Sequence, residues 1–332
     1  MRRIYTGDRP TGKLHLGHYV GTLSNRVALQ SKYKIFIGVV DIHSLTDQMD
    51  DPGKTLQMEE NIKNLVLDYL SVGINPDKTT ILLQSAIPET RELFAILMNV
   101  ATIARCERIP TLKEKIRDQK IKNPSMGLLN YPLLMASDIL GVRADLVPVG
   151  KDQESHVEFA REVAHTFNRL YQPIFPEPEA IIGEAKVLPG LDGKMKMSKS
   201  LDNAIYLSDT AGEVEKKVMS MFTDPKRVSM DTPGEVKGNP VFIYHDIFNK
   251  DAAEVENLKK RYGEGRVGDV EVKKRLADVI NKFLNPIRFR RNNFAKQEGL
   301  AEKTIKAGSQ KTRIEVQKTL AEVKKVLNIP QY

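Results

Sequence analysis

Strand-like and helix-like segments alternate along the first 170 residues, and this alternation constrains the fold more than any other feature. Residues 35–40 form an unbroken apolar, partly β-branched run, typical of a strand covered on both faces. Residues 55–72 carry apolar side chains at helical spacing and end before Gly73. The alternation predicts βαβ units. The expected strands are residues 2–6, 35–40, 79–83 and 144–149, and the expected helices are residues 15–31, 55–72, 89–104 and 152–171.

The pattern changes after Asn203, where strand signals thin out and amphipathic helical patterns dominate. We therefore expect an α/β fold with a doubly wound parallel (Rossmann-type) domain in residues 1–203 and an all-helical domain in residues 204–332. Ligands of such sheets bind at the carboxyl ends of the strands, where residues 7–18, 41–46 and 150–153 would converge. The helices expected after Asn203 are residues 214–221, 253–262, 270–284 and 304–327.

Positive charge is concentrated near the C-terminus. The segment from Lys273 to Lys325 holds 15 Lys and Arg against 5 Asp and Glu, whereas the whole chain has a net charge of +8. Solvated faces of amphipathic helices account for many of these charges individually. Their segregation favours a polyanionic partner, and a nucleic acid above all.

Several classes of protein are excluded by composition. The single cysteine, Cys106, cannot form an intramolecular disulfide or a cysteine-based metal site, and it is best explained as a buried thiol. The six histidines show no zinc spacing, so no structural metal is expected. No apolar run reaches the length of a membrane span, and the first residues lack a signal-type apolar segment, so we expect a cytoplasmic protein without membrane contact.

The first motif is His15-Leu16-Gly17-His18, which follows a strand and a turn and opens a helix. A helix N-terminus attracts anions, and two imidazoles there can donate hydrogen bonds to a phosphate. Gly17 lets a flat ring such as adenine approach the backbone. The tetrapeptide by itself is a weak signal, because chance and core histidines produce it too.

The second motif is Lys196-Met197-Ser198-Lys199-Ser200, after a turn-forming stretch that ends at Gly193. Its two lysines can close over a departing pyrophosphate, although an isolated pentapeptide of this kind could be a solvated basic loop. The two motifs in this order, separated by a βα domain, are far more specific than either alone.

With both motifs, the whole chain from Tyr5 onward resembles the bacterial tryptophanyl-tRNA synthetases, a class I subgroup shared with the tyrosyl enzymes. The resemblance implies that His15, His18, Lys196 and Lys199 are catalytic. It further implies an ATP site that comprises Arg9, Gly17, His18, Lys113, Gly150, Asp152, Gln153, Met197 and Lys199. Arg9 and Lys113 are the weakest assignments, because ordinary exposed basic residues explain them nearly as well.

Residues 131–140 resemble the specificity helix of that family, in which an aspartate accepts a hydrogen bond from the indole N–H and a methionine packs on the ring. Independently of the family, Asp138 lies in an otherwise apolar helix, where a carboxylate is costly without a donor. A structural partner, or exposure to solvent, is the alternative. The implied tryptophan-binding residues are Tyr5, Gly7, His43, Met135, Asp138, Val147, Val149 and Gln153. A plain strand-to-helix turn remains the alternative for residues 147–153, and a structural histidine for His43.

Two departures from the family matter. Many bacterial relatives have Asn or Thr within the first motif, whereas this chain keeps His15 and His18, so its phosphate contacts can differ in detail. Some relatives bind an iron–sulfur cluster through four cysteines, which one cysteine cannot do.

The resemblance implies that L-tryptophan reacts with Mg-ATP to give tryptophanyl-adenylate, and that tryptophan is then transferred to the 3′-terminal adenosine of tRNA(Trp). Mg²⁺ is expected to travel with ATP rather than in a protein site, and the helical domain is expected to hold the anticodon stem. A homodimer is implied by the family alone. The alternatives are a tyrosyl-tRNA synthetase, disfavoured by Met135, a small-molecule nucleotidyltransferase, and a non-enzymatic RNA-binding paralogue.

Overall fold

The computed structural model describes residues 1–47, 49, 51–118, 120–182, 188–193, 197–198, 201–227 and 229–330. The chain forms two compact units, and neither unit is continuous in sequence. Unit 1 contains Met1–Gly12, Asn25–Ala185 and Gln297–Tyr332, and unit 2 contains Lys13–Ser24 and Lys186–Lys296. This arrangement differs from the single boundary after residue 203 that the sequence suggests, because the first motif and the last helix each lie in the unit opposite to the one expected. The assignment of functions to the domains stays a prediction.

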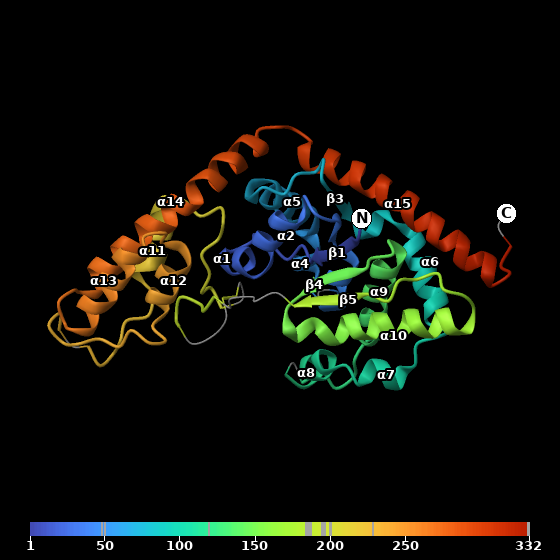
Figure 1. Ribbon diagram of the computed structural model, residues 1–332, viewed down its shortest axis with the longest axis horizontal. Coiled ribbons are helices and arrows are strands. Elements are labelled where there is room, and N and C mark those ends of the chain that lie inside the picture. The colour runs from blue at the N-terminus through green and yellow to red at the C-terminus, as the bar shows by residue number, and fades with distance from the viewer. Residues whose placement is uncertain are drawn as a thin grey trace. The chain divides into compact units, whose positions relative to one another are not determined.

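Unit 1 is built on a five-stranded parallel sheet with the strand order β3-β2-β1-β4-β5. The order reverses at the β1–β4 pair, so right-handed crossovers place helices on both faces of the sheet. Figure 1 shows α2 and α5 on one side and α9 and α10 on the other. The predicted doubly wound fold is therefore confirmed. The strands are β1 (Arg3–Asp8), β2 (Lys34–Val39), β3 (Thr79–Leu83), β4 (Leu146–Val149) and β5 (Glu179–Ile182).

Helices of unit 1 fill the connections between these strands. A buried cluster of side chains joins α6, α9 and α10 to the sheet, with Leu133, Ile139 and Phe159 among its fully buried members. None of the described helices is long and apolar enough to cross a membrane. The helices are α2 (Ser24–Leu29), α3 (Asp41–Ser44), α4 (Pro52–Leu56), α5 (Met58–Val72), α6 (Pro88–Leu97), α7 (Ile103–Glu107), α8 (Pro110–Asp118), α9 (Met126–Gly141), α10 (Glu154–Leu170) and α15 (Leu300–Val326).

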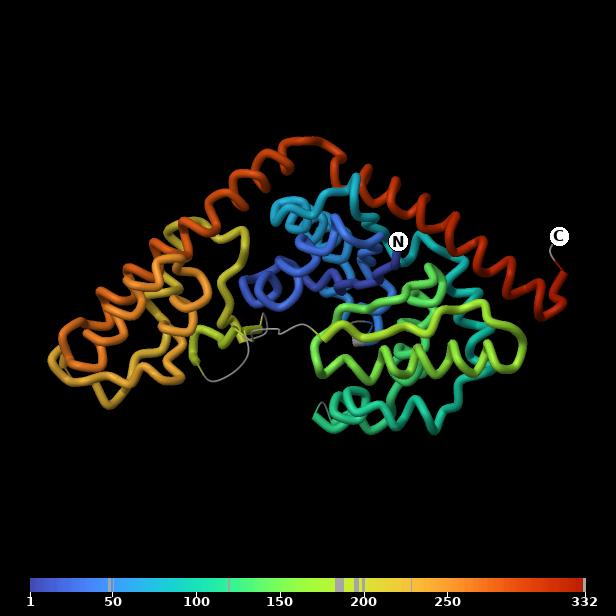
Figure 2. The backbone as a smooth tube through the Cα atoms, in the orientation of Figure 1, coloured from blue at the N-terminus to red at the C-terminus, as the bar shows by residue number. Residues whose placement is uncertain are grey.

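The last helix, α15, covers the edge strand β3, and Figure 2 shows this red segment against unit 1. Its backbone approaches the strand so closely that a methyl group on Gly308 would lie 1.8 Å from the carbonyl oxygen of Ile81. Next to it, Ser309 Oγ accepts the backbone N–H of Leu83 at 3.0 Å. Arg313 is paired with Glu89 on α6. Part of the basic C-terminal segment therefore packs on the sheet of unit 1. By covering the edge strand, it shields backbone N–H and C=O groups that no neighbouring strand pairs with.

A buried ion pair ties three elements of unit 1 together. The Arg26 guanidinium on α2 contacts the Asp8 carboxylate at the end of β1. The Tyr69 hydroxyl on α5 donates to the same carboxylate at 2.6 Å. Only 4% of the Arg26 side chain is exposed. A guanidinium out of contact with water needs its counter-charge, so this cluster fixes α2 and α5 to the first strand.

The described part of unit 2 combines the start of the first helical segment with four later helices. The segment begins with α1 (Leu16–His18), passes through a π-helical turn at Tyr19–Leu23 and continues into α2. Helices α11 and α12 both pack on the long helix α14. The buried ammonium of Lys273 on α14 donates to the carbonyl oxygen of Met221 and to Thr223 Oγ1, both at 2.6 Å. The later helices are α11 (Ala211–Met219), α12 (Pro240–Phe248), α13 (Ala252–Gly263) and α14 (Asp269–Ala295).

Candidate active site

The carboxylate of Asp138 lies on α9 and is held by side chains from two strand ends of unit 1. Gln84, which directly follows β3, donates from Nε2 to Oδ2 of Asp138 at 2.6 Å. His43, on the short helix α3 after β2, places Nε2 3.5 Å from the same oxygen. Asp138 is only 4% exposed. The structure thus supplies the donors that a carboxylate in an apolar helix requires.

Burial raises the pKa of Asp138, while His43, Gln84 and the Tyr5 hydroxyl act in the opposite direction. Burial also raises the pKa of the Tyr5 hydroxyl, and the Asp138 carboxylate raises it further. Gly38 on β2 makes room for this hydroxyl, because a methyl group there would lie 2.5 Å from the Tyr5 oxygen. Side chains from β1 and from the ends of β2 and β3 therefore converge on one buried carboxylate, as expected for a ligand site of a doubly wound sheet.

A second pair of side chains lies beside this network. His156 on α10 makes a hydrogen bond through Nε2 with the Tyr131 hydroxyl at 2.9 Å. The Tyr131 ring meets the His43 ring edge-on at a centroid distance of 6.5 Å. Burial lowers the pKa of His156 to about 4, and the nearby His43 adds to this effect. A neutral imidazole at position 156 is therefore part of the site at neutral pH.

We predict that His156 makes the folded protein sensitive to acid. Its folded pKa of about 4 lies below the ordinary value of 6.5, so between these values the unfolded chain binds more protons and stability rises with pH. Wild type should lose about 2 kcal/mol more of its free energy of unfolding between pH 7 and pH 5 than His156→Gln. Urea unfolding at both pH values measures this difference. His165→Gln, an exposed position on the same helix, is the control, and equal losses in wild type and His156→Gln would contradict the prediction.

The other residues expected around tryptophan lie on β1, β4 and α9 of unit 1 or in the turn after β4. Val147 on β4 is buried, whereas Val149, at the end of the strand, and Met135 on α9 are half-buried. Gly7, near the end of β1, cannot carry a side chain, because a methyl group would lie 2.8 Å from the carbonyl oxygen of Gly38. Gln153 follows β4, in the turn that leads into α10. These positions are compatible with the expected pocket, and their roles stay predictions.

Residues expected around ATP are divided between the two units. In unit 1, Gly150 and Asp152 follow β4, while Arg9 follows β1 and is exposed. Lys113 is exposed on α8. Neither basic side chain differs in exposure from an ordinary surface residue, so the structure adds no argument for the weakest ATP assignments.

Unit 2 brings the two signature motifs together. A methyl group on Gly17 would lie 3.5 Å from Cβ of Met197, although 180 residues separate these positions. The backbone N–H of His15 donates to Nδ1 of His18 at 3.1 Å, and the two rings lie 3.7 Å apart between centroids. An accepting Nδ1 leaves the proton of a neutral imidazole on Nε2, where it can be donated to a ligand. Met197 is 4% exposed. The predicted catalytic residues Lys196 and Lys199 lie outside the described residues.

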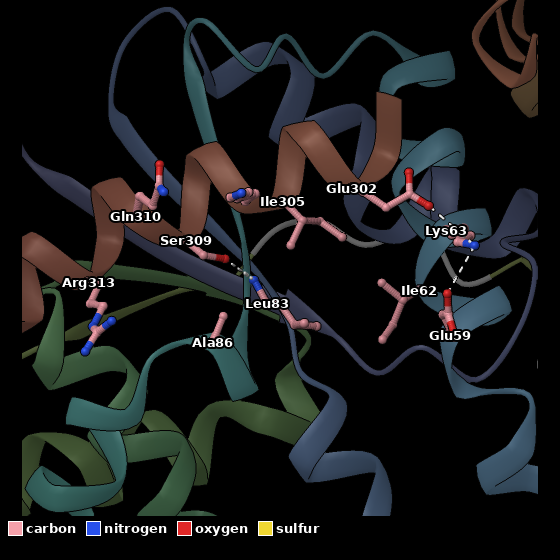
Figure 3. A pocket seen from close by; sticks show the side chains of 11 residues that line it. Glu59, Ile62, Lys63, Leu83, Ala86, Glu302, Ile305, Ser309, Gln310 and Arg313 are labelled. Carbon is pink, nitrogen blue, oxygen red and sulfur yellow. Dashed lines mark hydrogen bonds and ion pairs between the residues drawn. The ribbon is translucent and has the colours of Figure 1, made fainter. Parts of the chain in front are cut away.

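A cavity of about 480 Å³ lies in unit 1 between α5, the end of β3 and α15 (Figure 3). Its wall is apolar at Ile62 and Ile305, and Lys63 bridges Glu59 and Glu302 at one end. None of the residues predicted to bind ATP or tryptophan lines it. Among the residues that the structure describes, no three His, Cys, Asp or Glu side chains gather as metal ligands.

Gln84, Tyr131 and His156 have no assigned role in the sequence-based prediction. Gln84 could have been found from the rule that side chains after parallel strands converge, because it directly follows the predicted strand at residues 79–83. His156 gives no such signal. It occupies an ordinary helical position, and only the packing of α10 on α9 brings it to Tyr131.

Comparison with known proteins agrees with this arrangement. The family model for class I tRNA synthetases (W and Y) matches residues 1–285. A tryptophan–tRNA ligase of Borreliella burgdorferi is 49% identical over 328 residues, covering 98% of this chain and 93% of that protein. A tryptophan–tRNA ligase of Treponema pallidum is 48% identical over 99% of this chain and 97% of its own length.

A solved structure shares the fold over nearly the whole chain. The tryptophanyl-tRNA synthetase of Campylobacter jejuni, complexed with ADP and tryptophan, has a TM-score of 0.87 and 31% identity, and the match covers 98% of this chain and 99% of that one. The chain therefore belongs to the class I tRNA synthetases of the tryptophan and tyrosine family. The resemblance to the bacterial tryptophanyl branch, first seen in the motifs, is confirmed.

Proposed function

We propose that this chain is a tryptophan–tRNA ligase. The observation that carries the substrate assignment is the buried Asp138 carboxylate at the converging strand ends. A buried acceptor matches the indole N–H of tryptophan, and the family membership supplies the reaction. A pocket built around such an acceptor rejects ligands that lack a donor, because the acceptor would be left unpaired.

The reaction has two steps. An oxygen of the tryptophan carboxylate attacks the α-phosphorus of ATP, the bond to the bridging oxygen breaks, and pyrophosphate leaves with its electron pair. A hydroxyl of the terminal adenosine of tRNA then attacks the acyl carbon of tryptophanyl-adenylate, and AMP leaves. Positioning and charge stabilisation provide most of the catalysis in such transfers.

The first motif supports the phosphate chemistry. The backbone N–H of His15 donates to Nδ1 of His18, so a neutral His18 carries its proton on Nε2, and Gly17 lies against Met197 of the second motif. By resemblance to the family, Lys196 and Lys199 neutralise the charge that develops on the leaving pyrophosphate. Mg²⁺ enters as Mg-ATP and supplies further charge neutralisation at the phosphates.

The partner that we propose for unit 2 is tRNA(Trp). On α14, Lys274 and Lys282 are exposed, and no acidic partner among the described residues neutralises them. Such cations suit contacts with phosphates, which give affinity that falls steeply with salt. Homodimer formation and a cytoplasmic location remain part of the proposal through the family alone.

Pyrophosphate exchange with each of the twenty amino acids, followed by charging of tRNA, tests the function. We expect exchange with tryptophan alone and transfer of tryptophan to tRNA(Trp). Exchange with tyrosine alone would identify the tyrosyl activity instead. No adenylate with any amino acid would favour an RNA-binding paralogue, and exchange without transfer to any tRNA would favour a small-molecule nucleotidyltransferase.

A further inference from the structure

The contacts of Asp138 are distributed unequally between its two carboxylate oxygens. Gln84 Nε2 and His43 Nε2 both approach Oδ2, at 2.6 and 3.5 Å. Among the described residues, none donates a hydrogen bond to Oδ1. The Tyr5 hydroxyl lies near enough to lower the pKa of the carboxylate. Its distance and angles do not meet those of a hydrogen bond to any described residue. One oxygen is therefore occupied by the protein, and the other remains available as an acceptor.

The orientation of the Gln84 side chain is fixed by its second contact. The backbone N–H of His43 donates to Gln84 Oε1 at 3.2 Å. Since a backbone N–H can only donate, the amide oxygen of Gln84 must face His43 and its NH₂ group must face Asp138. Gln84 is 1% exposed, so no water competes for either contact. The amide therefore acts as a rigid link between α3 and Asp138.

The backbone that carries Gln84 is itself clamped. The preceding N–H, that of Leu83, donates to Ser309 Oγ on α15, as the dashed line in Figure 3 shows. Arg91 on α6 donates to the carbonyl oxygen of Gln84 at 3.3 Å. Hydrogen bonds to the backbone on both sides of the Gln84 side chain, at the N–H of Leu83 and the carbonyl oxygen of Gln84, thus hold this residue in position. A precisely placed recognition group requires such support.

We propose that Gln84 is a positioning residue that sets the discrimination for the indole N–H, because it occupies Oδ2 of Asp138 and directs Oδ1 alone towards the substrate. This inference rests on the proposed tryptophan specificity. With Oδ2 occupied and the carboxylate unable to turn, a ligand without an N–H leaves Oδ1 unpaired in a buried site, which is costly. Without Gln84, the carboxylate can turn and satisfy its acceptors from His43 or Tyr5, so such a ligand is penalised less.

The test compares tryptophan with β-(3-benzothienyl)alanine, in which sulfur replaces the indole N–H. The ratio of kcat/KM for the two amino acids in pyrophosphate exchange is measured for wild type and for Gln84→Met. We expect the ratio to fall by about 10-fold in Gln84→Met, the size of a hydrogen bond to a charged group. KM for ATP should stay unchanged.

Gln30 provides a matched control in the same unit. Its Nε2 donates to the carbonyl oxygen of Gly73 at 3.0 Å, and its Oε1 accepts the backbone N–H of Asn75 at 2.9 Å. Gln30→Met therefore removes the same number of side-chain amide hydrogen bonds away from Asp138, with a backbone carbonyl oxygen in place of the carboxylate as the acceptor. It should leave the discrimination ratio at the wild-type value, even where it lowers stability.

The pH profile provides a readout that a merely structural role would not move. Gln84 is one of the groups that lower the pKa of Asp138, so its loss raises that pKa while His43 and Tyr5 still face the carboxylate. In Gln84→Met, the acid limb of the pH profile of kcat/KM for tryptophan should shift to higher pH. In Gln30→Met, the acid limb should stay at its wild-type position.

Each outcome separates this inference from the proposed function. Absence of tryptophan activation by wild type would defeat the proposed function itself. Activation by wild type with an unchanged ratio and an unshifted acid limb in a folded Gln84→Met would overturn the positioning role alone. If circular dichroism shows that Gln84→Met is unfolded, Gln84→Asn is used, because its shorter amide cannot span both partners, and the same expected and contrary results apply.

Discussion

Replacing Asp138 by alanine should lower kcat/KM for tryptophan in pyrophosphate exchange by on the order of 10³ to 10⁴, with little change in KM for ATP. The substitution removes the buried acceptor and leaves the indole N–H unpaired. It also removes the carboxylate that Gln84 and His43 hold in place. Asp138→Asn should be impaired in the same direction. The amide offers only one acceptor oxygen, and its NH₂ group cannot accept the hydrogen bond that Gln84 Nε2 donates.

Exchange kinetics at saturating ATP, with equilibrium binding of tryptophan, measure the effect. Asp145→Ala is the matched control, since this half-buried carboxylate of the same unit accepts a backbone N–H from Arg3 at 2.7 Å and belongs to no predicted site. Unchanged tryptophan affinity in Asp138→Ala would refute the assignment of Asp138 as the indole acceptor.

Replacing Asp8 by alanine should lower the free energy of unfolding by about 3 to 5 kcal/mol. The physical reason is that Arg26 is 4% exposed and cannot become neutral, so it would remain in the interior without its counter-charge. The Tyr69 hydroxyl, which donates to Asp8 at 2.6 Å, would lose its acceptor too.

Urea unfolding followed by far-ultraviolet circular dichroism measures this loss, and the chain's lack of Trp makes that signal preferable to fluorescence. Glu158→Ala is the control for an ion pair, because Glu158 and its partner Arg161 are both largely exposed and such surface pairs contribute little to stability. A loss of similar size in both variants would show that the Arg26 charge is compensated in some other way.

Much of the sheet could be predicted because its strands are local signals. The sequence predicts the strand over residues 79–83 with the observed bounds, and the apolar run over residues 35–40 predicts β2 within one residue at each end. β5 was missed, since Glu179–Ile182 is a short edge strand with no fully buried side chain. The helical pattern over residues 15–31 contains a π-helical turn at Tyr19–Leu23, which apolar periodicity cannot reveal.

The candidate site was only partly visible in the sequence. Asp138 could be singled out because a carboxylate in an apolar helix is costly, and that argument needs no three-dimensional information. Its partner Gln84 carries no such cost as a neutral amide, and only its position directly after a predicted strand points to the site. His156 could not be singled out from the sequence, because its lowered pKa depends on the burial that the packing of α9 and α10 creates.

The sequence by itself determined the chemistry of the site and the class of the protein. The residue types in the two motifs, and the carboxylate in an apolar helix, define which functional groups are present whatever the fold. Only the tertiary structure decided how those groups are used. Gly17 lies against Met197, and the basic helix α15 covers β3 instead of joining the helices of unit 2. Such contacts join residues far apart in the chain, and their free energy depends on which surfaces meet, which no local pattern encodes.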